Sequence, residues 1–173
     1  MSKTIDDFRN FFRPRKRKET FSISKEIQNA FELILASFKN HNIEIEKNLD
    51  DSLIAIGYPN EFSQVLLNIF TNAKDALIEI KIVKPKVSVR SFQENSKIIV
   101  EIEDNAGGID EKIMKKIFDP YFTTKDKTSG TGIGLYMSKM IIENSMKGEI
   151  SAYNSPKGAV FRIKIEKGAT KDA

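Results

Sequence analysis

Apolar residues recur at helical spacing in several parts of this chain. The longest such stretch runs from Asn60 to about Ile82 and predicts a helix. Its expected buried stripe consists of Phe62, Leu66, Ile69, Ala73, Leu77 and Ile80. The same spacing predicts a helix over residues 25–38 with Ser24 as its N-cap. It also predicts a helix over residues 135–146, with Gly148 just past its end.

Short alternating or continuous apolar runs predict the strands. They cover residues 43–45, 53–56, 86–92, 97–103, 149–153 and 159–166. Residues 93–96 are expected to turn a hairpin between the middle two strands, and residues 154–158 to join the last two. This order of helices and strands indicates an α+β fold, a two-layer sandwich with a mixed, mostly antiparallel sheet and helices on one face.

Composition narrows the class of protein. The chain has 173 residues, 40% of them apolar and 30% charged, which is ordinary for one globular domain with an appendage. No apolar run approaches the ~20 residues that a membrane span needs. The lack of cysteine excludes disulfides and thiolate chemistry and fits a reducing compartment. The single histidine, His41, rules out a multi-histidine metal site.

The N-terminal segment differs from the rest. Residues 4–13 have a short amphipathic helical pattern that Pro14 ends, and so short a helix must pack on something else. Arg13–Lys18 holds five basic residues in six, a pattern that can bind nucleic acid. We favour a solvated linker and no nucleic acid partner, because the rest of the chain offers no recognition helix or aromatic platform. Three parts are therefore expected: residues 1–19, residues 20–166, and a polar tail, residues 167–173.

Two glycine clusters are candidates for a binding site. Asp104-Asn-Ala-Gly-Gly108 follows a predicted strand, and Gly130-Thr-Gly-Ile-Gly134 opens a predicted helix. Glycine lets a backbone approach a ligand closely, and a helix N-terminus favours a phosphate because its free N–H groups and its dipole both attract anions. The polar residues between the clusters are interpreted as a lid. The polar residues Asn68, Asn72, Asp75 and Glu79 lie on one face of the longest helix, as expected of a pocket wall.

At this point the chain resembles a known family. The segments 68–76, 104–108, 118–122 and 130–134 are similar to the N, G1, F and G2 boxes of the catalytic ATP-binding domain of bacterial sensor histidine kinases, within the Bergerat-fold superfamily. The resemblance covers residues 20 to about 166. It implies a protein histidine kinase of two-component signal transduction with ATP and Mg²⁺ as ligands. The variants of the boxes resemble the nitrogen-regulation-like branch.

The resemblance implies roles for particular residues. Asp104 would accept a hydrogen bond from the adenine amino group, which distinguishes adenine from guanine. Asn72 would bind Mg²⁺, and Asn68 would contact phosphate or metal-bound water; these two are the expected catalytic residues. Asp75 would hold a metal-bound water or a local network. The other expected nucleotide contacts are Gly107, Gly108, Ile109, Phe118, Thr123, Thr124, Lys125, Gly130, Thr131, Gly132, Ile133, Gly134 and Leu135.

The type of reaction depends on position 68. Relatives that hydrolyse ATP have a glutamate there, whereas Asn68 is not a base, so the resemblance favours transfer of the γ-phosphate to another group. The acceptor would be a histidine on a dimerisation hairpin of the same or a sister chain, for which residues 4–13 would be the stump. His41 is disfavoured as the acceptor because it lies in a turn before the first predicted strands. A response regulator, a homodimeric parent and a cytoplasmic location are implied, and membrane anchoring of the parent stays open.

Two alternatives remain. One is a serine kinase of the anti-sigma type, which shares the fold. The other is a non-catalytic module that senses nucleotides, against which the intact boxes argue.

Overall fold

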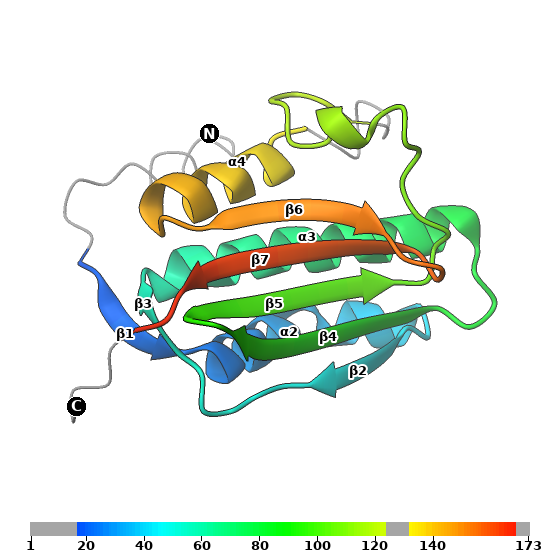
Figure 1. Ribbon diagram of the computed structural model, residues 1–173. Helices are drawn as coiled ribbons and strands as arrows, with labels where there is room; N and C mark the ends of the chain where they lie inside the picture. The colour runs from blue at the N-terminus through cyan, green and yellow to red at the C-terminus, as the bar shows by residue number, and fades with distance from the viewer. Residues whose placement is uncertain (1–16, 124–131, 169–173) are drawn as a thin grey trace, which may run out of the picture.

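Five strands form the main sheet of the computed structural model, which describes residues 17–123 and 132–168 (Figure 1). The strand order is β2 (Glu44–Asn48), β4 (Lys86–Glu94), β5 (Lys97–Asp104), β7 (Ala159–Glu166) and β6 (Glu149–Asn154). Among these described strands, β2 and β4 run parallel, and the other neighbours are antiparallel. The prediction of a mixed, mostly antiparallel sheet is confirmed, as is the hairpin of β4 and β5.

Helices α2 (Ile23–Asn40), α3 (Pro59–Ile80) and α4 (Gly134–Met140) cover one face of this sheet (Figure 1). Side chains alternate along a strand, so each strand turns every second residue toward the helices. The strand residues buried in the shared core include Val87, Val89, Ile98, Val100, Ile102, Ile163 and Ile165. None of the helices in the described ranges is long and apolar enough to cross a membrane.

Helix α3 crosses the middle of the sheet. It begins at Pro59, whose fixed φ and missing N–H suit a first helical position, and it ends before Lys81 in the left-handed conformation. The predicted buried stripe is confirmed except at its last member. Ile80 is 53% exposed because it lies in the final turn, at the edge of a cavity instead of over the sheet.

The start of α2 differs from the prediction. Ser22 is the N-cap, and its hydroxyl accepts a hydrogen bond from the Lys25 backbone N–H at 3.2 Å. The prediction of Ser24 as the N-cap is wrong, because its side chain is buried and donates to the Asp50 carbonyl at 3.3 Å. The helix therefore starts two residues earlier than its apolar pattern suggests.

A second, two-stranded sheet was not predicted. Strand β1 (Glu19–Ser22) pairs with β3 (Ile54–Gly57) in antiparallel register. The chain after β7 also joins it, since Lys167 bridges to Ala55 and the Gly168 N–H donates to the Ile54 carbonyl at 2.8 Å. The domain thus extends two residues beyond its predicted end. The predicted N-terminal helix, residues 4–13, and the rest of the predicted tail lie outside the described residues.

The last helix also differs in detail. Helix α4 continues as a π-helical segment, η2 (Ile141–Ser145), so the helical region ends one residue before the prediction. The left-handed residue that follows is Lys147, not Gly148. Gly148 packs so closely that a Cβ there would lie 2.3 Å from the Lys164 carbonyl oxygen. Close approach to β7 therefore explains this glycine better than its expected role at the helix end.

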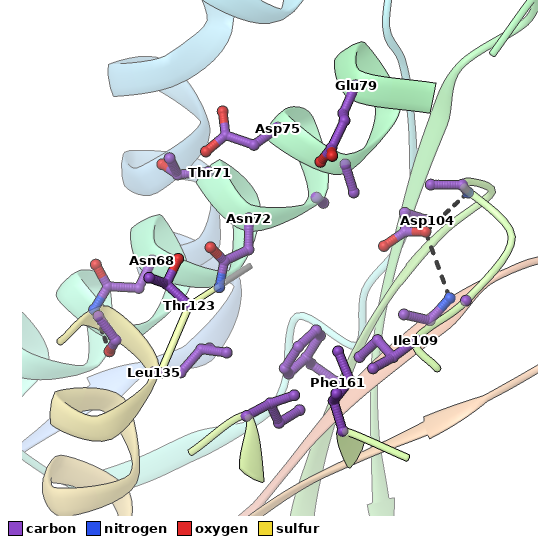
Figure 2. Close-up of a pocket in the computed structure, with 18 of the residues that line it drawn as sticks. Asn68, Thr71, Asn72, Asp75, Glu79, Asp104, Ile109, Thr123, Leu135 and Phe161 are labelled. Carbon is purple, nitrogen blue, oxygen red and sulfur yellow. Dashed lines mark hydrogen bonds between the residues drawn. The ribbon is translucent and has the colours of Figure 1, made fainter. Parts of the chain in front are cut away.

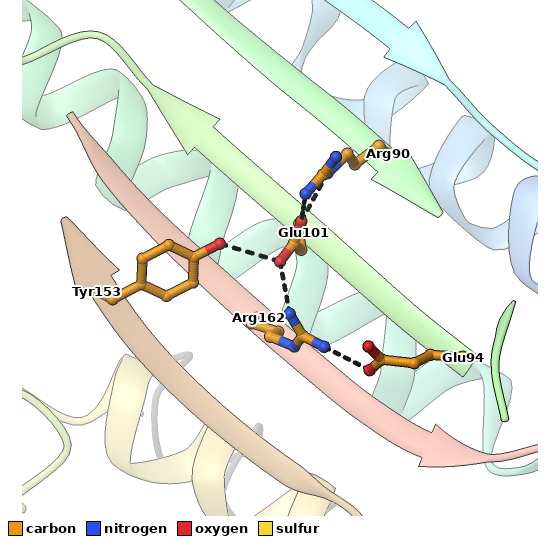
Figure 3. A network of polar contacts seen from close by, with 5 residues as sticks. All are labelled: Arg90, Glu94, Glu101, Tyr153 and Arg162. Atoms are coloured by element: carbon orange, nitrogen blue, oxygen red, sulfur yellow. Dashed lines mark hydrogen bonds and ion pairs between the residues drawn. The ribbon is translucent and has the colours of Figure 1, made fainter. Parts of the chain in front are cut away.

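The sheet face away from the helices carries a network of charges (Figure 3). Glu101 is its centre and is only 2% exposed. Its carboxylate accepts hydrogen bonds from Arg90 Nε at 2.6 Å, Tyr153 Oη at 3.0 Å and Arg162 Nη1 at 3.1 Å. Arg162 also pairs with Glu94 at 2.7 Å. These contacts connect β4, β5, β6 and β7 through one buried carboxylate.

Candidate functional site

A cavity of about 510 Å³ lies between α3, the chain after β5, the start of α4 and β7 (Figure 2). Its volume is in the range of pockets for small molecules. Apolar side chains such as Ile109, Leu135 and Phe161 line one side, and polar side chains of α3 line the other.

Asp104 marks one end of the cavity. It is 6% exposed at the end of β5, and its Oδ1 accepts hydrogen bonds from the N–H groups of Ala106 at 2.9 Å and Ala159 at 3.4 Å. The other carboxylate oxygen points into the cavity (Figure 2). Burial raises the pKa of Asp104, and the two backbone hydrogen bonds partly oppose that rise. The cavity therefore presents a fixed, poorly solvated acceptor to an amino group.

Glycine at position 158 permits this arrangement. A Cβ there would lie 2.2 Å from the Asp104 carbonyl oxygen and 2.8 Å from its Oδ1. The turn before β7 therefore approaches Asp104 closely enough for the Ala159 N–H to reach the carboxylate. A larger residue would separate the two.

The opposite end of the cavity is formed by the second glycine cluster and Asn68. Gly132 has a φ of +71°, and a Cβ there would lie 2.4 Å from the carbonyl carbon of Tyr121. Asn68 Nδ2 donates to the Gly134 carbonyl and to Ser138 Oγ, both at 3.1 Å, while its Oδ1 accepts from Gln64 at 3.2 Å. The amide of Asn68 thus joins α3 to α4. Its expected contact with phosphate or metal-bound water stays a prediction.

Between these ends, Asn72 and Asp75 line the cavity from α3 (Figure 2). In the part of the chain that the structure describes, no group of three or more His, Asp or Glu side chains could hold a metal ion. The donor set suits a magnesium ion that takes one amide oxygen from the protein and its other ligands from phosphate and water. It does not suit a metal held by the protein alone.

The structure brings most of the predicted site residues to this one cavity. Those that line it are Asn68, Asn72, Asp75, Asp104, Gly108, Ile109, Thr123, Gly132, Gly134 and Leu135. Gly107 and Ile133 do not line it. Phe118 does not line it either, but its ring packs edge-on against that of the lining residue Phe161, with 6.2 Å between the ring centroids. Thr124, Lys125, Gly130, Thr131 and the predicted lid, residues 125–130, lie outside the described residues.

Sequence reasoning missed several lining residues. On α3 they are Thr71, Ala73, Ala76 and, at the outer end, Ile80; Ala73 and Ile80 had been assigned to the buried stripe. Counting on by four from Asn72 reaches Ala76, so helical spacing could have found it, as it had already placed Glu79 on the polar face. Ala159 and Phe161 of β7 also line the cavity. No local signal identifies these two, because their position depends on which strands are neighbours in the sheet.

This fold and cavity define a class of protein: an ATP-binding domain in which helices cover one face of a mixed sheet and a cavity lies between α3 and two glycine-rich segments. Residues 57–169 match the family described as histidine kinase-, DNA gyrase B-, and HSP90-like ATPase, and the chain belongs to this family.

Curated relatives include bacterial sensor kinases. The chain is 35% identical to the signal transduction histidine-protein kinase AtoS of Escherichia coli, over 94% of this chain and 26% of AtoS. It is 30% identical to the sensor protein FixL of Bradyrhizobium diazoefficiens, over 88% of this chain and 30% of FixL. The chain therefore spans less than a third of the length of these two relatives.

Solved structures agree with this assignment. The catalytic domain of the histidine kinase ThkA matches with a TM-score of 0.78 and 29% identity, over 88% of this chain and 97% of that domain. ThkA in complex with the response regulator protein TrrA matches with a TM-score of 0.75 and 25% identity, over 95% of this chain and 46% of that chain.

Proposed function

We propose that this chain is the catalytic ATP-binding domain of a two-component sensor histidine kinase. It binds Mg-ATP and presents the γ-phosphate to a histidine on a dimerisation hairpin of the same or a sister chain. The observation that carries the proposal is the carboxylate of Asp104. Two backbone N–H groups fix one of its oxygens, and the other faces the cavity, where it would accept a hydrogen bond from the adenine amino group.

The rest of the cavity would orient the nucleotide. Ile109 and Phe161 offer apolar surface to the base. Asn72 would supply an amide oxygen to a magnesium ion that neutralises the phosphates, and the residues around Gly134 would receive them. In phosphoryl transfer most of the catalysis is positioning and charge neutralisation, so these residues would act chiefly by holding the γ-phosphate in line with its acceptor.

Asn68 supports transfer over hydrolysis. Its side chain carries no carboxylate, and its amide is hydrogen-bonded to Gly134 and Ser138 within the protein. It is therefore not suited to remove a proton from water. The relatives that are named histidine kinases favour histidine over serine as the acceptor.

The proposal extends to the parent protein. We infer that it is a homodimer that passes its phosphoryl group to a response regulator, as the complex of ThkA with TrrA suggests by analogy. We also infer that residues 1–19 continue from the dimerisation hairpin, and that the domain lies on the cytoplasmic side, where ATP is available.

A calorimetric titration tests the first step. The chain should bind Mg-ATP and not Mg-GTP, because Asp104 discriminates between an amino group and a carbonyl group. Transfer of labelled phosphate from ATP to a separately supplied histidine hairpin, and not to a serine-bearing partner protein, tests the second step. Equal binding of both nucleotides would contradict the adenine pocket. Phosphorylation of serine alone would favour the anti-sigma-type kinase.

A further inference from the structure

The turn between β6 and β7 reaches across to the glycine-rich loop that follows Asp104. Asn154, the last residue of β6, is exposed and does not line the cavity. Its side-chain Oδ1 accepts a hydrogen bond from the Ile109 N–H at 2.8 Å, and its Nδ2 donates to the Ile109 carbonyl at 2.7 Å. One side-chain amide therefore binds both backbone groups of a residue that is 45 positions away in the sequence.

Among side chains of this length, only the amide of asparagine can make both hydrogen bonds. The amide carries one acceptor and one donor group, and the two Ile109 backbone groups require one of each. Reversing the amide would bring donor against donor and acceptor against acceptor, so the hydrogen bonds also fix its orientation. An aspartate of the same shape would keep the acceptor for the N–H but would place an oxygen against the Ile109 carbonyl.

The loop is one that needs such a support. Gly107 and Gly108 have φ values of +92° and +95°, and neither has a side chain to anchor it. Glycine loses more conformational freedom on ordering than any other residue. Gly108 packs directly on the amide, since a Cβ there would lie 2.7 Å from Asn154 Oδ1. The close contact and the two hydrogen bonds hold the same short segment.

Ile109 connects this segment to the nucleotide site. Its side chain lines the cavity and packs against the hydrophobic core, five residues after Asp104. The same turn also orients Asp104, through the Ala159 N–H. The β6–β7 turn therefore holds the acceptor carboxylate and the loop beside it in one fixed relation.

We propose that Asn154 is a positioning residue for the base of the nucleotide. It holds the backbone of Ile109 so that the base end of the cavity is formed before the ligand arrives. Binding to a preformed cavity avoids the cost of ordering the loop, and that saving appears as affinity. The inference rests on the proposed function, because it assumes that an adenine base lies beside Ile109.

The test compares three variants with the wild-type chain. Asn154→Ala removes both hydrogen bonds to Ile109 and the 3.4 Å contact with Glu111, and Asn154→Asp keeps the shape but replaces the donor with a charged carboxylate oxygen. Asn144→Ala is the matched control, because Asn144 is also an exposed asparagine and does not line the cavity. Affinity for Mg-ATP and for inorganic tripolyphosphate, which engages only the phosphate end, is measured by calorimetry for each.

We expect Asn154→Ala and Asn154→Asp to weaken ATP binding about tenfold, as two exposed hydrogen bonds would predict. Tripolyphosphate binding should stay within twofold of wild type, whereas general damage to the fold would lower both affinities together. Hydrogen exchange of the amides of residues 106–110 should become faster in the two Asn154 variants and not in Asn144→Ala.

The outcomes separate this inference from the proposed function. If wild-type protein binds no Mg-ATP, the proposed function fails and this inference fails with it. If wild type binds ATP and Asn154→Ala binds it equally well, the inference alone is wrong. Equal losses for ATP and tripolyphosphate would also overturn it, since they would indicate a purely structural role. Wild-type affinity in Asn154→Asp would show that the donor to Ile109 is not needed.

Discussion

The substitution Asp104→Asn replaces one carboxylate oxygen with an NH₂ group and so tests the role of that oxygen in the site. The N–H groups of Ala106 and Ala159 both donate to Oδ1 of Asp104. An asparagine there would keep its carbonyl oxygen toward these donors, so its NH₂ group would have to take the place of the oxygen that faces the cavity. The cavity would then present a donor where the adenine amino group also brings a donor.

The expected loss has two parts. A hydrogen bond to a charged acceptor contributes about 1.5–3 kcal/mol, and leaving a buried donor without an acceptor costs about 1–3 kcal/mol. Together they give about 2.5–6 kcal/mol, which is roughly seventyfold to twenty-thousandfold in ATP affinity. Inosine triphosphate has a carbonyl in place of the amino group, so Asp104→Asn should bind it better than it binds ATP.

Asp104→Asn should raise the free energy of unfolding although it lowers ATP affinity. The pKa of Asp104 is raised above its usual value of 3.8, chiefly by burial, so the folded state binds a proton more readily than the unfolded state. Its ionised form therefore lowers the free energy of unfolding as the pH rises from about 3.8 through the raised pKa. Asp104→Asn removes this effect. The variant should resist urea better than wild type at pH 7, and the difference should shrink as the pH is lowered toward 3.8.

The assay is calorimetric titration of both proteins with Mg-ATP and Mg-ITP, together with urea unfolding at several pH values. Asp51→Asn is the control, because it makes the same chemical change at an exposed position that does not line the cavity. ATP affinity within threefold of wild type in folded Asp104→Asn would refute the role of the carboxylate. A stability difference that grows toward low pH would refute the sign of the pKa argument.

Three further predictions concern other parts of the fold. Asn72→Ala should lower ATP affinity about tenfold with magnesium and much less with a chelator present; equal losses in the two titrations would argue against a metal ligand. Gly158→Ala should lower the free energy of unfolding by about 1–3 kcal/mol in a denaturant titration, because its Cβ would meet the Asp104 backbone at 2.2 Å. Glu101→Gln should lower the free energy of unfolding by about 1–3 kcal/mol in the same titration. This loss is smaller than for a fully buried ion pair, because Arg90 and Arg162 are partly exposed. The substitution should leave ATP affinity unchanged, since Glu101 lies on the other face of the sheet.

The parts of the fold that sequence predicted are those with a strong local pattern. The α3 stripe from Phe62 to Leu77 repeats over several helical turns, so one atypical position does not change the prediction. The hairpin of β4 and β5 pairs residues that are close in the sequence, so a local pattern is enough to predict it. Strand β1 was missed because it is four residues long and buries only Phe21 among its apolar side chains. Its existence depends on β3, which lies more than 30 residues further on. The N-cap of α2 moved to Ser22 for a similar reason, since Ser24 is used by a distant carbonyl.

The residues of the candidate site also fall into those with a local sequence pattern and those placed by long-range strand pairing. Asp104, Gly108, Gly132 and Gly134 could be placed at the cavity from sequence because they belong to two short glycine-rich segments. Asn154 could not, because it reads as an ordinary turn residue until the sheet places it beside Ile109. Ala159 lines the cavity and donates to Asp104 only because β7 lies next to β5. Which residues surround a pocket is decided by long-range pairing that a local pattern does not contain.

The position of β7 has a consequence for how the domain is made. It is the last described strand in the sequence, yet it lies between β5 and β6 in the sheet. During synthesis, β5 and β6 therefore leave the ribosome with exposed edges that stay unpaired until residues 159–166 have followed. Unpaired edges are sites of aggregation, so a ribosome that stalls or stops just before residue 159 should yield insoluble chains and not a soluble, weakened domain.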